Sequence, residues 1–468
     1  MNIPAQSVIP LIVACSLFME QLDSTIIATA LPTIAHSLGE DPLRLNLAIT
    51  CYLLSISIFI PVSGWMADRF GARTVFRAAI GVFMIGSIAC GLSNTLWEFV
   101  FARMLQGMGG AMMSPVGRFV MLRSVEKSEL MRAMIIVTTP AMLGPVFGPP
   151  LGGFIVTYFS WRWIFFINVP MALLGILLVT LFVENLREDN VRPLDLPGFI
   201  LTGIGLSCLV FGFEIAGRGG LPTSVVSAMI VVGAICLAIY IWHARRTAFP
   251  VLDLNLLKIT TFRIGVTGGT LTRMGIGALP FLLPIMLQLG FGYSPITSGL
   301  VTFASAAGAM TMRVTATRII RYFGYRRTLI FNSILTSATL AINALWRPST
   351  PLLLIFTVLL LGGFFRSLQF SAVNTLGYSD IPPAMMSRAT PFASMAQQFA
   401  MSLGVGTGAL LLHLTLVFHG LAALGPADFT PAFVGVGLIS LGAVPIFLKL
   451  SPQAGAAVIG HARSAPET

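Results

Sequence analysis

The sequence predicts an all-α polytopic membrane protein with fourteen membrane-spanning helices. Hydrophobic residues make up 56% of the 468 residues and charged residues only 10%, whereas a soluble domain carries about 25% charged residues. A membrane helix needs about 20 mostly apolar residues, and fourteen stretches of the chain meet that length. A third observation is the segment 140–153, where prolines and glycines crowd into an otherwise apolar stretch. Neighbouring membrane helices can satisfy the backbone groups that such residues free, so the segment indicates a helix inside a membrane.

The expected spans follow one another with short connections. They cover residues 9–36, 45–66, 75–93, 97–122, 132–158, 163–183, 196–215, 222–242, 262–290, 295–319, 328–346, 351–378, 391–419 and 429–450. In the loops and ends on one side of the membrane we count 19 Lys and Arg residues, against 4 on the other side. Because short positive loops stay in the cytoplasm, we expect both termini to be cytoplasmic.

A weak internal repeat divides the chain. Residues 64–73 follow the second span and residues 317–326 follow the tenth, with Gly71 matching Gly324. Parallel repeats of this kind occur in secondary transporters. We expect an N-terminal six-helix bundle over 1–190, two inserted helices over 191–255, a C-terminal six-helix bundle over 256–450 and a disordered cytoplasmic tail over 451–468.

The composition argues against other function classes. The net charge of +11 would suit a nucleic-acid binder, but no segment is long enough for the folded basic face that such a partner needs. The five cysteines and five histidines show no metal-ligand spacing. No phosphate-binding Gly-Lys-Ser/Thr loop is present. We therefore expect no nucleic-acid partner, no metal, no cofactor and no enzymatic activity.

Two acidic residues lie inside the first span. Glu20 and Asp23 are three residues apart, which places both carboxylates on one helix face. A charge at the bilayer centre costs about 2.5–3.5 kcal/mol or more and usually serves a function, so we expect this pair to take up and release protons. A static partnership with a buried arginine is the alternative. Arg103 in the fourth span is expected to modulate a carboxylate's affinity for protons, and a polar pin between helices is the alternative for it.

The spans of the second half carry cationic and amide side chains. Arg273 and Arg366, together with Gln369, Asn374 and, in the first half, Gln106, are expected to line a polar substrate cavity. A position outside the cavity is the alternative for the two arginines.

The connection between the second and third spans is short. Its distinctive residues are Gly64, Asp68, Arg69, Gly71 and Arg73. A short loop keeps the two helices together, and Asp68 can cap a helix N-terminus or pair with an arginine, which would latch one conformation. The alternative is that these charges are only the basic residues that any cytoplasmic loop carries. The spacing of the charges between flanking glycines favours a gate.

Glycine and proline recur through the fifth span. The residues are Gly144, Pro145, Gly148, Pro149, Gly152 and Gly153. The two Gly-Pro steps are four residues apart and fall on nearly one helix face. We expect a kinked helix that packs closely against a neighbour.

Five segments together resemble the major facilitator superfamily, specifically its fourteen-helix drug:proton antiporter branch. They are Leu22–Pro32, residues 64–73, Arg103 with Gln106 and Gly107, residues 144–153, and Trp161–Pro170. The resemblance covers nearly the whole chain. It is strongest to bacterial inner-membrane exporters of the multidrug or homocysteine-resistance type.

The resemblance implies a role for each matching residue. Asp23 would be the proton-coupling carboxylate, and Arg103 would couple protonation to conformation. The three charged residues of segment 64–73 would hold the outward-facing gate. The Gly-Pro steps of the fifth span would seal the two halves and favour export.

The chain departs from the family pattern at three positions. Ala28 stands where the family often has asparagine, Glu20 is an additional carboxylate, and Arg366 is an unusual charge for its span. These departures bear on the substrate and the coupling rather than on the fold.

The sequence as a whole predicts a proton-driven exporter of small organic molecules, antibiotics among them, that works by alternating access. We expect a monomer in the bacterial inner (plasma) membrane whose partners are protons, a small-molecule substrate and the lipid bilayer. An uptake permease or facilitator of the same fold is one alternative. A non-transporting membrane sensor is another.

Overall fold

The chain folds into helices. The computed structural model describes residues 5–124, 130–185, 193–216, 222–382, 385–419 and 424–455. Every regular element within these ranges is helical, so the predicted all-α class is confirmed. Of the predicted tail at 451–468, residues 456–468 lie outside the described ranges.

Most helices are long and apolar enough to cross a membrane. In the part of the chain that the structure describes, eleven helices meet that requirement. The three other predicted spans also fall on helices, namely α4 (Leu96–Ser124), α5 (Leu130–Tyr158) and the first part of α11 (Pro295–Ile342). The polytopic character predicted from the sequence is therefore confirmed.

The chain forms two compact units. Unit 1 comprises residues 1–251 and 280–303, and unit 2 comprises residues 252–279 and 304–468. One boundary falls at Pro280, inside α10 (Thr260–Ile285). Proline removes a helical hydrogen bond and weakens the helix there, so this is a natural place for the chain to pass from one unit to the other.

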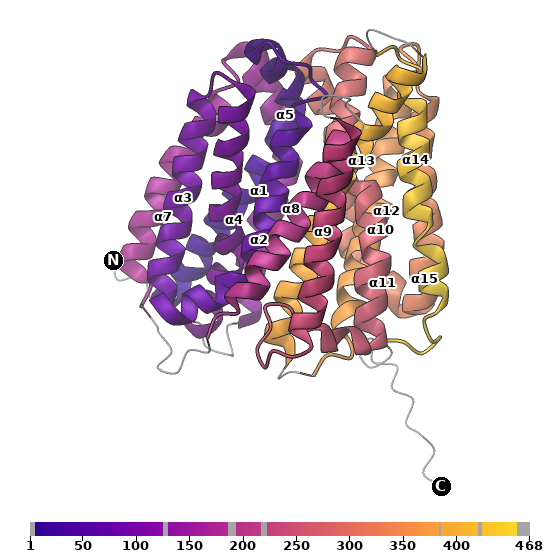
Figure 1. Ribbon diagram of the computed structural model, residues 1–468. Coiled ribbons are helices and arrows are strands. Elements are labelled where there is room, and N and C mark those ends of the chain that lie inside the picture. The colour runs from indigo at the N-terminus through magenta and orange to yellow at the C-terminus, as the bar shows by residue number, and fades with distance from the viewer. Residues whose placement is uncertain are drawn as a thin grey trace. The chain divides into compact units, whose positions relative to one another are not determined.

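Unit 1 holds the first nine α-helices (Figure 1). Besides α4 and α5 these are α1 (Ala5–Leu38), α2 (Asn46–Phe70), α3 (Ala72–Leu92), α6 (Trp163–Phe166), α7 (Asn168–Phe182), α8 (Leu196–Ala216) and α9 (Thr223–Ala244). Helix α1 packs along α5, and α4 packs on both α2 and α3. The core between them includes Val13, Phe76, Phe83 and Met113.

Glycines let α4 approach its neighbours closely. A Cβ atom at Gly109 would lie 2.4 Å from the backbone nitrogen of Phe83 on α3, and one at Gly107 would lie 2.6 Å from the backbone oxygen of Tyr52 on α2. Small residues at such crossings permit close backbone contact between membrane helices. The polar side chains of α4 are thereby brought within hydrogen-bonding reach of other helices.

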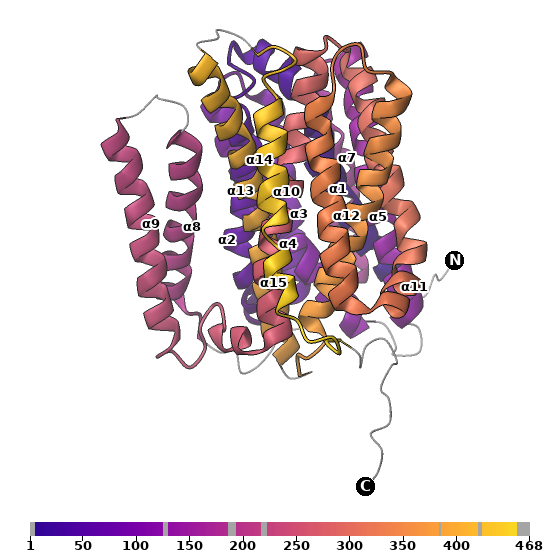
Figure 2. The same cartoon turned by 90° about the vertical axis from the view of Figure 1, so that its right-hand side faces the viewer.

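Helices α8 and α9 form a side-by-side pair, seen in Figures 1 and 2. Asp195, which is buried, lies just before α8. Its carboxylate accepts hydrogen bonds from the backbone N–H groups of Gly198 at 3.0 Å and Val251 at 3.1 Å, and contacts Nε2 of His243 at 2.6 Å. A single carboxylate therefore joins the start of α8, the end of α9 and the segment that follows.

Unit 2 contains the remaining helices (Figure 2). Besides parts of α10 and α11 they are η1 (Leu254–Lys258), η3 (Asn343–Leu345), α12 (Leu352–Tyr378), α13 (Met386–His419), α14 (Thr430–Leu441) and α15 (Val444–Leu448). Its core includes Ile264, Met312, Leu329 and Phe447. The segment η2 (Met286–Gly290), which continues α10, belongs to unit 1.

Helix α11 bends sharply at Gly324, where φ is 75° and ψ is 161°. The sequence predicts two spans with a connecting loop here, and the structure reduces that connection to a kink. Gly71, the matching residue of the repeat, separates α2 from α3 with φ of 90°. Residues with a Cβ avoid positive φ, so both positions require glycine for the same reason, which supports the internal repeat.

Candidate functional site

A buried carboxylate lies among three helices of unit 1. Asp23 on α1 is only 1% exposed. Its Oδ2 accepts a hydrogen bond from Nη1 of Arg103 at 2.7 Å. Its Oδ1 accepts from Nε2 of Gln106 at 2.8 Å and from Nδ2 of Asn168 at 2.9 Å. Because all three partners donate, the arrangement fits a negatively charged Asp23.

Arg103 on α4 is fully buried. Besides Asp23, its Nη1 donates to Oε1 of Gln106 at 2.5 Å, and its Cζ lies 4.0 Å from the centroid of the Tyr52 ring. An arginine over an aromatic face gains a cation–π attraction. Its Nε and Nη2 have no hydrogen-bond partner among the described residues. The guanidinium therefore depends on Asp23 for its neutralisation and keeps donors free for another arrangement.

Two members of this network have no role in the sequence prediction. Asn168 begins α7 and also donates to Oγ of Ser87 on α3 at 3.2 Å, and Gln106 donates to the same oxygen at 2.6 Å. Asn168 falls inside the family-like segment 161–170, which is the one signal that marks it. Ser87 is a small residue in an apolar helix, and nothing in the sequence distinguishes it.

Glu20 lies one helical turn before Asp23 and outside this network. It is 8% exposed, and its Oε2 has no hydrogen-bond partner in the described part of the chain. A buried charge without a partner is costly, and a proton would remove that cost. The two acids predicted to act as a pair therefore have different surroundings.

The glycines of α5 form a groove for α1. A Cβ at Gly144, Gly148 or Gly152 would lie 2.2–2.7 Å from atoms of α1 side chains, including Thr25 and Thr29. The hydroxyls of these two threonines donate back to backbone oxygens of α5, at 3.3 and 3.4 Å. The predicted close packing of this span is thus present, and α1, the helix with both acids, occupies the groove.

Two other residues of the same segment contact a different part of unit 1. A Cβ at Gly153 would lie 2.5 Å from the backbone oxygen of Pro295, and one at Gly299 would lie 2.2 Å from the backbone oxygen of Pro149. The start of α11 therefore packs on the later turns of α5. Pro145 is half-buried on the same helix.

Segment 64–73 turns between α2 and α3. Gly71 is buried, and a Cβ there would meet the side chain of Asn185, whose Oδ1 accepts from the backbone N–H of Thr74 at 3.2 Å. Asn185 therefore caps the first turn of α3. Gly64 and Arg69 are exposed, and Asp68 and Arg73 are half-buried.

The predicted cavity residues fall in several places. Gln106 belongs to the Asp23 network in unit 1. In unit 2, Nη2 of Arg273 donates to Oδ1 of Asn374 at 2.6 Å, and Nη2 of Arg366 donates to Oγ of Ser305 at 2.5 Å. Gln369 donates to Oγ of Ser333 at 2.7 Å and accepts from Asn332 at 2.9 Å. The structure brings Arg273 and Asn374 together in a hydrogen bond that the sequence alone does not predict.

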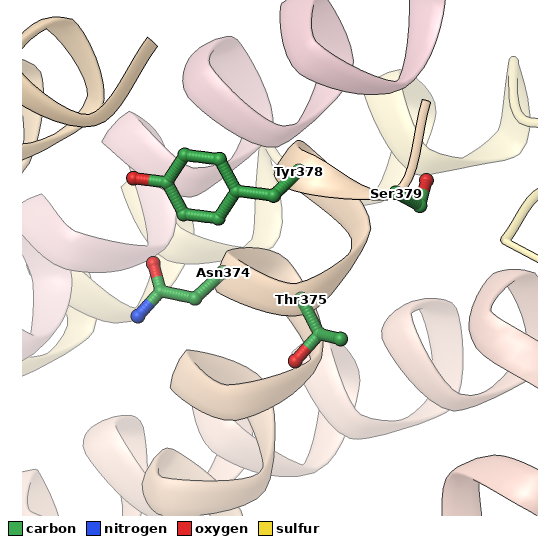
Figure 3. Close-up of a pocket in the computed structure, with 4 residues that line it drawn as sticks. All are labelled: Asn374, Thr375, Tyr378 and Ser379. Carbon is green, nitrogen blue, oxygen red and sulfur yellow. The ribbon is translucent and has the colours of Figure 1, made fainter. Parts of the chain in front are cut away.

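A pocket of about 400 Å³ lies at the end of α12. Asn374, Thr375, Tyr378 and Ser379 line it, and Figure 3 shows Asn374 and Tyr378 projecting from the same side of the helix. No three His, Cys, Asp or Glu side chains gather closely enough to hold a metal ion within the ranges that the structure describes. The chemistry available is therefore that of buried carboxylates, guanidinium groups and amides.

Known proteins resemble this chain over nearly its full length. The "Putative multidrug resistance protein MdtD" of Yersinia pestis (strain Pestoides F) is 39% identical over 452 residues, which cover 95% of this chain and 96% of that protein. The protein of the same name in Yersinia pseudotuberculosis serotype O:1b (strain IP 31758) gives the same values.

Solved structures share the fold at low identity. The crystal structure of an auto-inhibited POT family peptide transporter superposes with a TM-score of 0.71 at 14% identity, covering 99% of this chain and 98% of that chain. The crystal structure of a D-xylose-proton symporter gives 0.69 at 16% identity, covering 97% and 99%. A family model described as Major Facilitator Superfamily matches residues 13–405. The chain is therefore a multi-pass membrane transporter that belongs to the major facilitator superfamily.

Proposed function

We propose that this transporter is a proton-coupled exporter of small organic molecules that works by alternating access. The observation that carries the proposal is the buried Asp23–Arg103 pair, with Glu20 one turn away on the same helix. The name of the Yersinia relatives, a putative multidrug resistance protein, supports export of foreign compounds. No enzymatic step is part of this proposal.

Protonation of Asp23 would change how three helices pack. The carboxylate charge holds Arg103 and Gln106 from α4 and Asn168 from α7 against α1. A neutral Asp23 would attract these donors less, and Arg103 would lose its counter-charge. A ligand shifts a conformational equilibrium only by binding one state better than the other, and this site gives a proton such a preference.

Glu20 would be an additional proton acceptor. Its unpartnered oxygen makes the neutral form the less costly one inside the helix bundle. Asp23, which is tied to two other helices, would be the residue that converts protonation into movement. This division of roles predicts that Glu20→Gln changes the number of protons per cycle, whereas Asp23→Asn abolishes coupling.

The proposed direction of transport, which is export, rests on the close packing of α5. Its glycines hold α1 tightly, and Gly153 lies against the start of α11. We propose that this contact seals the site on the outer side and that segment 64–73 gates it on the inner side. The proposal includes two six-helix bundles with α8 and α9 inserted, cytoplasmic termini, a bacterial inner-membrane location and a monomeric state.

The test uses the purified full chain in proteoliposomes that contain a pH-sensitive dye. A substrate chosen by thermal-shift screening is loaded so that its gradient drives proton movement in the opposite direction. We expect Asp23→Asn to reduce this proton flux to that of empty liposomes. Glu98→Gln, which alters an exposed carboxylate at the start of α4, should retain native flux.

The possible outcomes separate the alternatives. Normal coupled flux through Asp23→Asn would overturn the assignment. Movement of substrate and protons in the same direction would indicate an uptake permease. Substrate flux that ignores an imposed proton gradient would indicate a facilitator, and binding without any flux would indicate a sensor.

A further inference from the structure

We propose that the exported substrate is a small apolar molecule with an acidic group, and that Arg273 of unit 2 binds that group. This inference rests on the proposed export function, and it names the substrate class. It depends on a charge imbalance inside unit 2, on the surroundings of Arg273 and on the pocket next to it.

The membrane-spanning part of unit 2 carries cations without acids. Between Asp253 and Asp380 the sequence contains no aspartate or glutamate. Asp253 pairs with Arg388, Asp380 accepts from Thr261, and the third described acid of the unit pairs with a histidine. The acids of unit 2 that the structure describes therefore lie at helix ends and are already engaged.

Two arginines of unit 2 are buried in this acid-free region. Arg273 is 6% exposed and Arg366 is 7% exposed. Neither has an ion-pair partner among the described residues. In unit 1, by contrast, the buried Arg103 is paired with Asp23. Ionisable residues inside membrane spans usually pair with an opposite charge or mark a substrate pathway, so the two arginines of unit 2 call for an external anion.

Arg273 is the better placed of the two. Its Nη2 donates to the neutral amide oxygen of Asn374, its Cζ lies 5.5 Å from the Phe370 ring centroid, and its Nε has no hydrogen-bond partner in the described ranges. A guanidinium offers five N–H donors in a planar fork that matches a carboxylate. Asn374 therefore fixes the orientation of the cation and does not neutralise it.

The pocket at the end of α12 shares two lining residues with a small space beside this cation. Asn374 and Tyr378 line the 400 Å³ pocket (Figure 3), and both also line a narrower pocket that Arg273 borders. The narrower pocket is otherwise lined mainly by apolar side chains, Phe262 and Val266 among them. The narrower pocket has a volume of only about 10 Å³, so an acid head at Arg273 with an apolar body against α10 requires these lining side chains to move apart when the substrate binds.

The location also suits an exporter. The charge distribution predicts that α12 ends at the cytoplasmic side, and Tyr378 is the last residue of that helix. An exporter takes its substrate from this side. Arg366 lies twelve residues, or more than three turns, before Tyr378 in α12, and, as a second cation without an acid, would favour deeper entry of the same anion.

The test measures binding to the purified, detergent-solubilised full chain without a proton gradient. The probes share one scaffold: naphthylacetate, its uncharged amide naphthylacetamide, and the cation naphthylmethylammonium. Ligand-induced thermal shifts are titrated for each. We expect the carboxylate to bind at least about tenfold more tightly than the amide and the cation not to bind.

Variants connect this preference with Arg273. Arg273→Gln, which keeps an amide near Asn374, should weaken binding of the carboxylate about tenfold and leave binding of the amide unchanged. Arg273→Lys should retain most of the preference. Arg263→Gln is the matched control, because Arg263 lies on the same helix and is exposed.

Three results would overturn the proposal. They are equal binding of the carboxylate and the amide to the unmodified protein, an undiminished preference in Arg273→Gln, and no carboxylate binding up to about 10 mM. The comparison of the probes on the unmodified protein tests the proposal even if Arg273→Gln fails to fold. Asp23→Asn should still bind the carboxylate, so a failure of proton coupling and a failure of anion recognition are distinguishable.

Discussion

The Asp23–Arg103 pair permits a quantitative test by a double-mutant cycle. The N–O distance is 2.7 Å and both side chains are fully buried. Coulomb's law at this distance, with an effective dielectric constant of about 20, gives an attraction of about 6 kcal/mol. Desolvation of the two groups offsets part of it, and breaking one side of a buried pair costs about 3–5 kcal/mol in proteins.

Each single substitution should therefore be strongly destabilising. Asp23→Asn leaves Arg103 without its counter-charge and turns an amide group toward donors from α4 or α7. Arg103→Gln leaves the carboxylate charge buried without a cation. We expect each to lower the free energy of unfolding by about 3–5 kcal/mol.

The double variant should lose less than the sum of the two. With both charges gone, no uncompensated charge stays buried, and the interaction energy between the two sites should be about 2–3 kcal/mol. Unfolding by a denaturing detergent in mixed micelles measures the free energies. The same preparations, reconstituted, should show that the double variant recovers stability but no proton-coupled flux.

Additivity would refute this reasoning. If the losses of the single variants sum to that of the double variant within about 0.5 kcal/mol, the two charges do not stabilise each other in the folded protein. Recovery of proton coupling in the double variant would refute the functional half, because no titrating carboxylate would then remain at position 23.

Two further predictions concern glycines. Gly148→Leu should destabilise the purified chain by about 1–3 kcal/mol or more, because a Cβ there would lie 2.2 Å from the hydroxyl oxygen of Thr25; an unchanged thermal midpoint would contradict the tight α1–α5 contact. Gly71→Ala should cost about 1–3 kcal/mol because φ is 90°. Gly64→Ala, in the same motif but with open surroundings, should raise stability by about 0.5–1 kcal/mol, so equal effects of the two alanine variants would speak against the backbone explanation.

The sequence predicts the helices well because a membrane imposes their length and composition. All fourteen expected spans fall on helices. The connection between the tenth and eleventh spans is the instructive difference, because one glycine at positive φ replaces the loop. The sequence marks Gly324 through its match with Gly71, but the length of a turn depends on backbone angles that residue types alone do not specify.

The candidate site is predictable only in part, because its residues come from distant segments. The charges of Asp23 and Arg103 stand out in apolar spans, yet they are 80 residues apart and their pairing requires the packing of α4 on α1. Asn168 is 145 residues from Asp23. Arg273 and Asn374 are 101 residues apart. The sequence marks costly groups, but the partners that satisfy them are determined by tertiary structure.

The chain passes from α9 to α10 through a segment that is fastened at both ends. The N–H of Val251 is bound by Asp195 within unit 1, and Asp253 is paired with Arg388 at 3.0 Å within unit 2. Only Leu252 lies between them, and two residues of extended chain reach at most about 7 Å. This connection between the two units is therefore very short and is held at both ends. Val251 and Asp253 therefore cannot move apart without breaking one of these two contacts, and glycines inserted between them would remove that restriction without changing a charge.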